Sequence, residues 1–267
     1  MPDISEHRAH STIKALLAGD SGTGKTGSLV SLVKAGYNLR ILDTDRGSDI
    51  LANLLKGQKL RPGQVQFETV EDGYKQIAGM ARADGKGFEK AISLMMKWSD
   101  GSNPVEWGSD TVLVVDSLTT MGRLSLNRTL KLVGKLQTGQ QPSQPDWGNA
   151  INDLKSFLET ILSNQFQCNV LVITHVTYKE GEDGVSRPFP NALGAKFPTE
   201  INTYFNNLIG YKISGSGQGA KRTIETVAVG QLGLKTSAPT QVQKSYELEN
   251  GLAQFFKDMG LTPPKVA

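Results

Sequence analysis

One octapeptide constrains the fold of this chain more than any other feature, because residues 19–26 read Gly-Asp-Ser-Gly-Thr-Gly-Lys-Thr. This octapeptide matches the phosphate-binding P-loop pattern G-x-x-x-x-G-K-[ST] at every fixed position. Its flanks fit as well, because Ile13–Ala18 is an apolar run suited to a buried strand and Thr26–Lys34 has apolar residues at helical spacing. Gly36 suits the position just after such a helix. The sequence therefore predicts a strand, a glycine loop and a helix in the order that phosphate binding requires.

The chemistry of this loop follows from its backbone. Glycines allow conformations that a Cβ would penalise, so several N–H groups can point at phosphate oxygens near the positive end of the following helix. We expect Lys25 to reach the β- and γ-phosphates and the Thr26 hydroxyl to hold Mg²⁺. A glycine-rich turn that matches by chance is the alternative, and the flanks argue against it. The predicted nucleotide-binding residues are Gly19, Asp20, Ser21, Gly22, Thr23, Gly24, Lys25, Thr26 and Gly27.

Length and composition set the outer limits. The 267 residues suit one α/β domain with insertions better than two full domains. A net charge of +3 does not by itself argue for a nucleic-acid partner. Cys168 is the only cysteine, so an intrachain disulfide is excluded and a small core residue is its simplest role. With no long apolar run and no leader-like N-terminus, we expect a cytoplasmic protein without a membrane partner.

Strand-like and helix-like segments alternate along the chain, which is typical of a mainly parallel sheet with helices on both faces. A helix is predicted from Asp146, as its N-cap, to Ser163. Leu208–Ile213 and Thr223–Val229 are predicted to form a C-terminal antiparallel hairpin. Ala83–Ser109 is interpreted as an insertion or irregular connection. The predicted strands lie near residues 13–18, 39–42, 65–67, 112–115, 170–174 and 208–213.

Two strand ends carry acids that suit a magnesium-dependent hydrolase. Thr111–Val115 is an apolar run that ends in Asp116, which we expect to hold Mg²⁺ at the sheet edge where doubly wound folds bind ligands. The run before Asp43 and Asp45 ends in both acids, and strand alternation would send them to the same face. We assign Asp45 as the carboxylate that orients the attacking water. Asp43 remains the alternative, and either acid could instead cap the helix expected near Ser48.

The next core strand, which ends at Thr174, is followed by His175. A polar side chain at this strand end is placed to sense the γ-phosphate, and an imidazole can donate to phosphate through one ring nitrogen. We therefore include His175 among the predicted catalytic residues, with Lys25, Asp45 and Asp116. The alternative is a histidine that only satisfies local hydrogen bonds.

These parts, in this order, resemble the RecA-type branch of P-loop ATPases. Ile41–Asp45 is similar to the RecA segment that ends in the catalytic acid, which is usually Glu in the family. Val114–Ser117 resembles the RecA Walker B segment, and Ile173–Thr177 resembles the RadA and KaiC version of the next motif. Asn191–Phe197 resembles the stretch that offers a lysine to a neighbouring subunit's nucleotide, which makes Lys196 a trans-acting candidate. The resemblance implies a RecA-like sheet, ATP in preference to GTP, and Mg²⁺.

The resemblance runs from about Lys14 to Gly230 and includes no N-terminal tether of the RecA recombinase kind. We divide the chain into a polar tail (1–11), a RecA-like ATPase core (12–240) and a C-terminal amphipathic segment and tail (241–267). A RecA core alone resembles the phage-encoded Sak-type single-strand annealing ATPases. That family implies single-stranded DNA as partner, self-association into a ring or filament, a single-strand DNA-binding protein as a further partner, and the host cytoplasm as location. Full strand invasion is not implied.

A DNA partner has some support in the charge pattern. Residues 117–145 contain no Asp or Glu but contain Arg123, Arg128, Lys131 and Lys135, a cluster that could follow a phosphate backbone. A solvated helix face followed by a polar loop is the alternative. A second basic region contains Lys212, Lys221, Arg222 and Lys235. Tyr178–Pro190 resembles a mobile second DNA loop in position, and its Arg187 could reach a neighbour's γ-phosphate or DNA. The candidates for base stacking are Trp98, Trp107 and Trp147, of which Trp147 suits a core position as well.

Three functions are compatible with these sequence features. The first is a DNA-dependent RecA-like ATPase that binds or anneals single strands. The second is a P-loop ATPase that acts as a loader or regulator on protein partners without touching DNA. The third is a small-molecule kinase, which is disfavoured because the strand-end acids and His175 suit water activation and no arginine-rich lid is evident.

Overall fold

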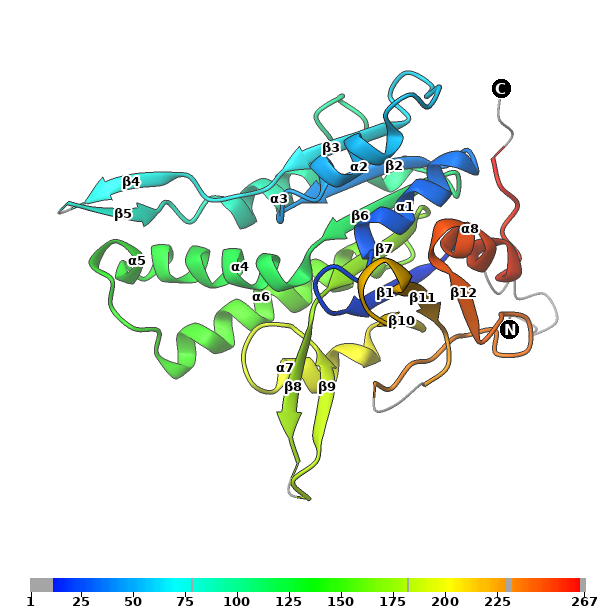
Figure 1. The fold of residues 1–267 in the computed structure, drawn as a ribbon. Helices are drawn as coiled ribbons and strands as arrows, with labels where there is room; N and C mark the ends of the chain where they lie inside the picture. The colour runs from blue at the N-terminus through cyan, green and yellow to red at the C-terminus, as the bar shows by residue number, and fades with distance from the viewer. Residues whose placement is uncertain (1–11, 78, 182, 229–231, 265–267) are drawn as a thin grey trace, which may run out of the picture.

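The structure is a computed structural model of the chain, and it describes residues 12–264 except for residues 78, 182 and 229–231. A central sheet of eight strands has the order β12-β11-β10-β1-β7-β6-β2-β3 (Figure 1). The ladders from β10 to β3 are parallel, and β11 and β12 add antiparallel strands beyond β10. The strands are β1 (Lys14–Gly19), β2 (Asn38–Asp43), β3 (Val65–Thr69), β6 (Thr111–Asp116), β7 (Asn169–Thr174), β10 (Asn207–Ser214), β11 (Lys221–Glu225) and β12 (Ser245–Glu247).

Helices cover both faces of this sheet because its central strands are apolar on both sides. In β1, Leu16 and Ala18 pack into a core formed with α3 (Gly87–Met96), α4 (Leu118–Leu132) and α6 (Gln144–Leu162). Ala15 and Leu17 pack into the opposite core, with α1 (Lys25–Lys34), α2 (Ser48–Leu55) and α8 (Leu248–Asp258). The predicted α/β class, with a mainly parallel sheet and a C-terminal antiparallel hairpin, is confirmed.

Two parts of the chain project from this body (Figure 1). We call the first the projecting lobe: it comprises the hairpin of β4 (Tyr74–Ile77) and β5 (Met80–Ala83), the outer end of α4, α5 (Lys135–Thr138) and the start of α6. The second is the hairpin of β8 (Val176–Glu180) and β9 (Ser186–Pro190), which leaves the sheet directly after β7. The remaining short elements are α7 (Phe197–Glu200) and 3₁₀ turns at Pro104–Glu106, Ile201–Thr203 and Gly217–Gly219.

Several local predictions need correction. Asp146 is not the N-cap of α6, because the helix begins at Gln144 and Ser143 takes the cap position. Asp146 is the third helical residue, and its carboxylate accepts a hydrogen bond from the Ser143 backbone N–H at 2.6 Å, which is half of a capping box. The stretch Ala83–Ser109 is not irregular throughout, because it contains α3. The segment predicted to be a mobile second loop is the antiparallel β8–β9 hairpin.

Two predictions extend outside the described residues, namely the polar tail at residues 1–11 and the end of the predicted hairpin at Val229. Cys168 is fully buried in the core, as predicted, and burial raises the pKa of its thiol to about 11. Among the helices of the described residues, none has the length and apolar character that spanning a bilayer requires.

Candidate nucleotide-binding site

The loop between β1 and α1 has the backbone that phosphate binding requires. Gly24 lies at φ +96°, where a side chain would be strained, and a Cβ there would come within 2.5 Å of Leu248 Cδ2. At Gly19, a Cβ would lie 2.8 Å from the Tyr211 carbonyl oxygen. Since α1 begins at Lys25, the N–H groups of its first turn have no partner within the helix and face the loop. The loop is therefore shaped as an anion cradle at a helix N-terminus.

Lys25 is buried, with 6 % of its surface exposed, and its ammonium group stays inside the loop. Its Nζ donates to the carbonyl oxygens of Gly19 at 2.7 Å and Asp20 at 2.8 Å. Burial lowers the pKa of Lys25, whereas the nearby carboxylates of Asp116, Asp20 and Asp45 act to raise it. A partly desolvated cation held by neutral carbonyls is ready to exchange them for phosphate oxygens.

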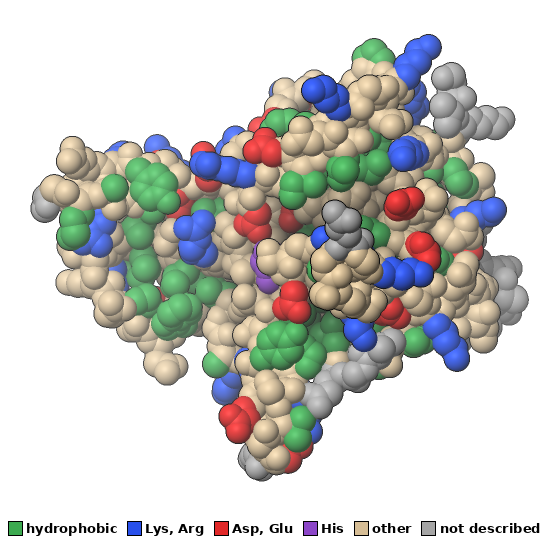
Figure 2. Space-filling view, in the orientation of Figure 1, with side chains coloured by type: hydrophobic (Ala, Val, Ile, Leu, Met, Phe, Trp, Pro, Cys, Tyr) green, Lys and Arg blue, Asp and Glu red, His purple; other side chains and the backbone are tan. Residues whose placement is uncertain are grey.

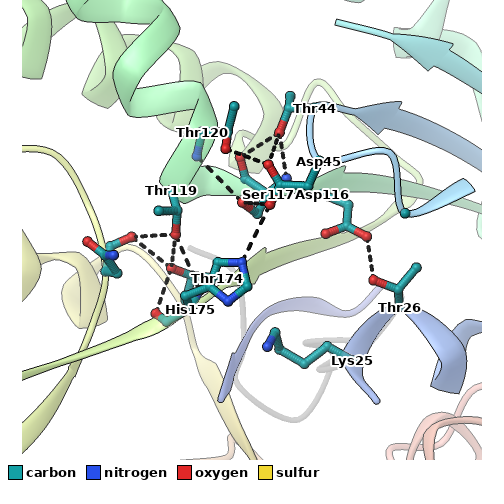
Figure 3. A network of polar contacts seen from close by, with 12 residues as sticks. Lys25, Thr26, Thr44, Asp45, Asp116, Ser117, Thr119, Thr120, Thr174 and His175 are labelled. Atoms are coloured by element: carbon teal, nitrogen blue, oxygen red, sulfur yellow. Dashed lines mark hydrogen bonds and ion pairs between the residues drawn. The ribbon is translucent and has the colours of Figure 1, made fainter. Parts of the chain in front are cut away.

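Thr26 and Asp116 bring two oxygen ligands together. The Thr26 hydroxyl donates to Asp116 Oδ2 at 2.6 Å (Figure 3). Burial raises the pKa of Asp116 to about 6, against the opposing effect of the Thr26 hydrogen bond. Asp116 is only 4 % exposed, so its carboxylate lacks the solvation that a cation would replace. Hydroxyl and carboxylate oxygens are the donors that Mg²⁺ prefers, so these two residues fit that ion.

Asp45 lies beyond the end of β2 and is held by a ring of donors (Figure 3). Ser117 Oγ donates to its Oδ2 at 2.6 Å, and the Thr120 hydroxyl donates to Oδ1. His175 Nε2, at the end of β7, lies 3.5 Å from Oδ2. Burial raises the pKa of Asp45, but the hydrogen bonds from His175, Ser117 and Thr120 outweigh it and hold the pKa at about 2. Asp45 is therefore firmly ionised and fixed in orientation.

Asp43 makes different contacts from Asp45. It is 1 % exposed, and its carboxylate accepts hydrogen bonds from the backbone N–H groups of Gly47 at 2.9 Å and Ser48 at 3.0 Å. These contacts cap the start of α2, which is one of the alternatives that the sequence left open. Strand alternation, on which the prediction of a shared face rests, does not extend to Asp45, because β2 ends at Asp43.

His175 also connects the site to the β8–β9 hairpin. Its backbone N–H donates to the Thr119 hydroxyl at 3.3 Å, and that hydroxyl donates to the Asn191 carbonyl oxygen at 3.1 Å. Thr174 donates to the same carbonyl oxygen at 2.8 Å. The start of α4 thus contacts Asp45 through Ser117 and Thr120 and the base of the hairpin through Thr119 (Figure 3).

One cavity of about 520 Å³ brings most of the predicted site residues together. Lys25, Thr26, Asp45, Asp116 and His175 line it. From the predicted glycine loop, Ser21, Gly22, Gly24 and Gly27 also line it. The other loop residues, Gly19, Asp20 and Thr23, line a separate cavity of about 360 Å³ on the β10 side of the loop.

Sequence reasoning missed part of this cavity. Its wall includes Ile50 and Leu54 from α2, Leu248 from the start of α8, and Arg222 from β11. Arg222 appeared in the sequence only as one member of a basic region, because nothing local connects it with a glycine loop 200 residues away. The hydroxyls that hold Asp45 were missed for the same reason. The Ser that follows Asp116 was the only signal available for them.

The predicted DNA-binding cations are mostly paired within the molecule. Arg128 forms an ion pair of 2.5 Å with Asp153 of α6, and Lys131 forms one of 3.0 Å with Glu89 of α3. Lys135 binds Asp146 at 2.5 Å. Residues 117–145 contain no acid in the sequence, but acids from the neighbouring helices lie beside their cations in the structure. Arg123 is exposed, and no ion pair of the described residues includes it.

The tryptophans also differ from the prediction. Trp98 and Trp107 are 1 % and 8 % exposed, and their rings meet edge-on at 5.4 Å, so neither is available for base stacking. Trp147, which suited a core position by its spacing, is 36 % exposed at the start of α6. Trp147 is the first residue of the apolar stripe of α6, and it is not in the core because the first turn of α6 extends past the sheet into the projecting lobe (Figure 1).

The two trans-acting candidates lie outside this cavity. Arg187, on β9, forms an ion pair with Asp183 in the same hairpin. Lys196 is exposed at the start of α7. In the second basic region, Lys221 pairs with Glu247 at 2.5 Å, whereas Arg222 contacts the glycine loop.

Comparison with known proteins agrees with this geometry. A family model described as an AAA domain matches residues 11–232, and the chain belongs to this family. Together with the mainly parallel sheet and the glycine loop, this match defines a P-loop fold of the AAA class. No curated protein matches the chain.

Solved structures were also found, and three of them have low identity to this chain. The flagellar accessory protein FlaH from Methanocaldococcus jannaschii is 13 % identical over 90 % of this chain and 87 % of that chain, with a TM-score of 0.42. The RadB recombinase is 14 % identical over 80 % of this chain and 79 % of that chain, with a TM-score of 0.44. A KaiC-like protein from Pyrococcus horikoshii OT3 is 14 % identical over 88 % of this chain and 84 % of that chain, with a TM-score of 0.46.

Proposed function

We propose that this protein binds ATP with Mg²⁺, hydrolyses the terminal phosphate, and couples that cycle to the binding and annealing of single-stranded DNA, as a Sak-type phage protein would. The observation that carries the ATPase part is the convergence of Lys25, Thr26, Asp45, Asp116 and His175 on one cavity from the ends of β1, β2, β6 and β7. Parallel strands place their carboxyl ends at one sheet edge, where such folds bind ligands.

Each residue has a separate task in this proposal. The loop N–H groups and Lys25 bind the phosphates, and Lys25 exchanges the carbonyl oxygens of Gly19 and Asp20 for phosphate oxygens. Thr26 and Asp116 would hold Mg²⁺, which neutralises charge on the phosphates when it is bound. His175, which reaches Asp45 at 3.5 Å, donates toward the terminal phosphate or keeps Asp45 in place.

Asp45 orients the attacking water rather than accepting a proton from it as a general base. A carboxylate with a pKa of about 2 is a weak base, so its contribution is a fixed acceptor and a local negative charge. The hydroxyls of Ser117 and Thr120 occupy part of the carboxylate and fix its orientation. Positioning of this kind is the main contribution that a protein makes to phosphoryl transfer.

The DNA part of the proposal rests on the family resemblance and on the charge of the surface. The protein carries a net charge of +3, and Arg123 is exposed on α4. A further groove of about 430 Å³, between the end of α1 and the α2–β3 connection, is lined by Lys34, Lys59 and Arg61, and none of the acids among the described residues lines it. Unneutralised cations of this kind support contacts with phosphates. We also propose a ring or filament in which Lys196 reaches a neighbour's nucleotide.

The deciding experiment measures ATP turnover with and without a single-stranded oligonucleotide, followed by particle size under the same conditions. We expect magnesium-dependent turnover, stimulation by the oligonucleotide, and a shift of labelled oligonucleotide that weakens as salt rises. Turnover without stimulation or shift would reject the DNA partner and keep the ATPase. If the protein shows neither nucleotide binding nor turnover, the whole proposal fails.

A loader or regulator that acts on proteins is the second candidate, and the projecting lobe favours it. Five large apolar side chains are exposed on this lobe, where Figure 2 shows apolar side chains gathered. A surface of this kind is typical of protein contacts. The exposed residues are Tyr74, Met80, Leu132, Val133 and Trp147. Double substitution of Met80 and Trp147 by Ser should spare turnover and oligonucleotide binding if the lobe serves only a protein partner.

A further inference from the structure

Arg222 belongs to a part of the chain that the catalytic motifs do not include, yet it contacts the glycine loop directly. Its Nε donates to the Gly22 carbonyl oxygen at 3.0 Å. It lines the same cavity as Lys25, and these two are the only Lys or Arg residues among the described residues that do so. Within the described part of the chain, the Nε bond is the only hydrogen bond that the Arg222 side chain donates. A guanidinium has five N–H donors, so most of its capacity remains for a ligand.

Sheet order fixes which end of a nucleotide Arg222 can serve. The strand that leads into the glycine loop, β1, lies between β7 on one side and β10 with β11 on the other. Asp45, Asp116 and His175 lie at the ends of strands on the β7 side, so the terminal phosphate and its water lie toward that side. Arg222 is on β11, on the opposite side of the loop. It is therefore placed toward the part of the nucleotide that lies farther from the reacting phosphate.

The surroundings of Arg222 suit a nucleoside. Leu248, the first residue of α8, packs so closely on Gly24 that a Cβ there would meet it at 2.5 Å, and the Arg222 Cδ would lie at 3.4 Å. Ile50 and Leu54, which also line the cavity, are 54 % and 50 % exposed. An open slot with apolar walls and one guanidinium matches a flat base attached to a phosphate.

We propose that Arg222 is a nucleotide-binding residue that holds the nucleoside monophosphate end, through the α-phosphate and the face of the base, from within the same subunit. The inference rests on the proposed nucleotide-binding function and adds a residue outside the catalytic motifs to it. Binding replaces solvent around the guanidinium, and the bond to Gly22 keeps the side chain in place before the ligand arrives. The C-terminal strands thereby become part of the nucleotide site.

The test compares Arg222→Ala and Arg222→Lys with Lys221→Ala, a matched control that removes the neighbouring cation paired with Glu247. Equilibrium affinities are measured for fluorescent ATP and ADP and, by competition, for inorganic tripolyphosphate. Unfolding temperatures without nucleotide are recorded in parallel. For Arg222→Ala we expect about tenfold weaker binding of ATP and ADP alike, which is the size of one charge-assisted contact. Tripolyphosphate has a phosphate at the α position but no base, so it should lose less affinity than the two nucleotides do. Arg222→Lys should restore only part of the loss.

Equal affinity of Arg222→Ala and wild type for both nucleotides would overturn the inference while the proposed function stands. A loss confined to ATP and tripolyphosphate would also overturn it, because Arg222 would then serve the terminal phosphate. A lowered unfolding temperature with unchanged affinity in Arg222→Lys would assign Arg222 to structure alone. Failure of the wild type to bind any nucleotide would reject the proposed function itself.

Discussion

The nucleotide site and the basic segment at residues 117–145 were both predicted from short stretches of sequence, and folding treats them differently. In the site, residues from four strand ends converge on one cavity. In the basic segment, Arg128, Lys131 and Lys135 each contact an acid from a neighbouring helix or turn. The difference teaches that a motif tied to strand ends is brought together by the sheet itself. The net charge of a run of basic residues is not fixed in the same way, because the acids that can pair with it come from elsewhere in the chain.

The largest expected effect concerns the nucleotide site. Lys25→Ala should lower ATP turnover by at least about 100-fold, because a cation aimed at developing phosphate charge is lost. Steady-state phosphate release measures it. Lys34→Ala, at the other end of α1, is the control and should keep turnover without oligonucleotide within about twofold, since an exposed charge away from the site contributes little. Wild-type turnover in Lys25→Ala would reject the site.

The next effect separates the two acids at the end of β2. Asp45→Asn should keep nucleotide affinity and slow hydrolysis by about 10- to 100-fold, because the fixed acceptor for the water is weakened. Asp43→Asn should instead lower stability by about 1 kcal/mol, because the amide NH₂ that replaces one carboxylate oxygen cannot accept one of the two backbone hydrogen bonds. Single-turnover hydrolysis and urea unfolding measure the two. The reverse outcome, with slow hydrolysis in Asp43→Asn and normal hydrolysis in Asp45→Asn, would exchange the assignments.

A third prediction concerns stability without nucleotide, where Asp116 and Asp45 should act in opposite directions. The pKa of Asp116 is raised from 3.8 to about 6, so its favourable contribution exists below pH 3.8 and is lost as pH rises through 6. Asp116→Asn should therefore stabilise the protein at pH 7, by about 1 to 3 kcal/mol. That gain should disappear near pH 4, while turnover is lost at all pH values.

Asp45 gives the contrasting sign. Its pKa is lowered from 3.8 to about 2, so its contribution is present above pH 3.8 and is lost as pH falls through 2. Asp45→Asn should therefore destabilise the protein at pH 7. Urea unfolding of both variants at pH 7 and pH 4 measures the pair. Shifts of the same sign at pH 7 would contradict this account of the two carboxylates.

The smallest effects are expected in the basic segment. Single Ala substitutions of Arg128, Lys131 or Lys135 should change oligonucleotide affinity by less than about twofold, because these cations are already paired. Arg123→Ala should weaken binding more and lower the salt slope by roughly one, if Arg123 contacts a phosphate. Fluorescence anisotropy at several salt concentrations measures both. A large loss in the paired variants, with normal unfolding, would restore the segment as the DNA surface.

Much of the fold could be predicted, because the core strands are apolar on both faces and are separated by helical patterns. The turn from β1 into α1 followed from the glycine motif alone. The lobe could not be predicted, since β4 and β5 are short, mostly exposed strands without a strong apolar pattern. Trp98 and Trp107 show a similar limit. An aromatic residue in a glycine-rich stretch is as compatible with a binding surface as with a core until its neighbours are known.

The sequence by itself determined the glycine cradle, Lys25, Thr26 and the carboxylate of Asp116, because each depends on backbone shape and on a residue type at a fixed place along the chain. Only the tertiary structure separated the contacts of Asp43 from those of Asp45, paired three cations of the basic segment with acids and brought Arg222 to the loop. Those outcomes depend on contacts between side chains that are far apart in sequence. Hydrogen bonds and ion pairs act over a few ångströms, so their partners are fixed only when the sheet and its helices have packed.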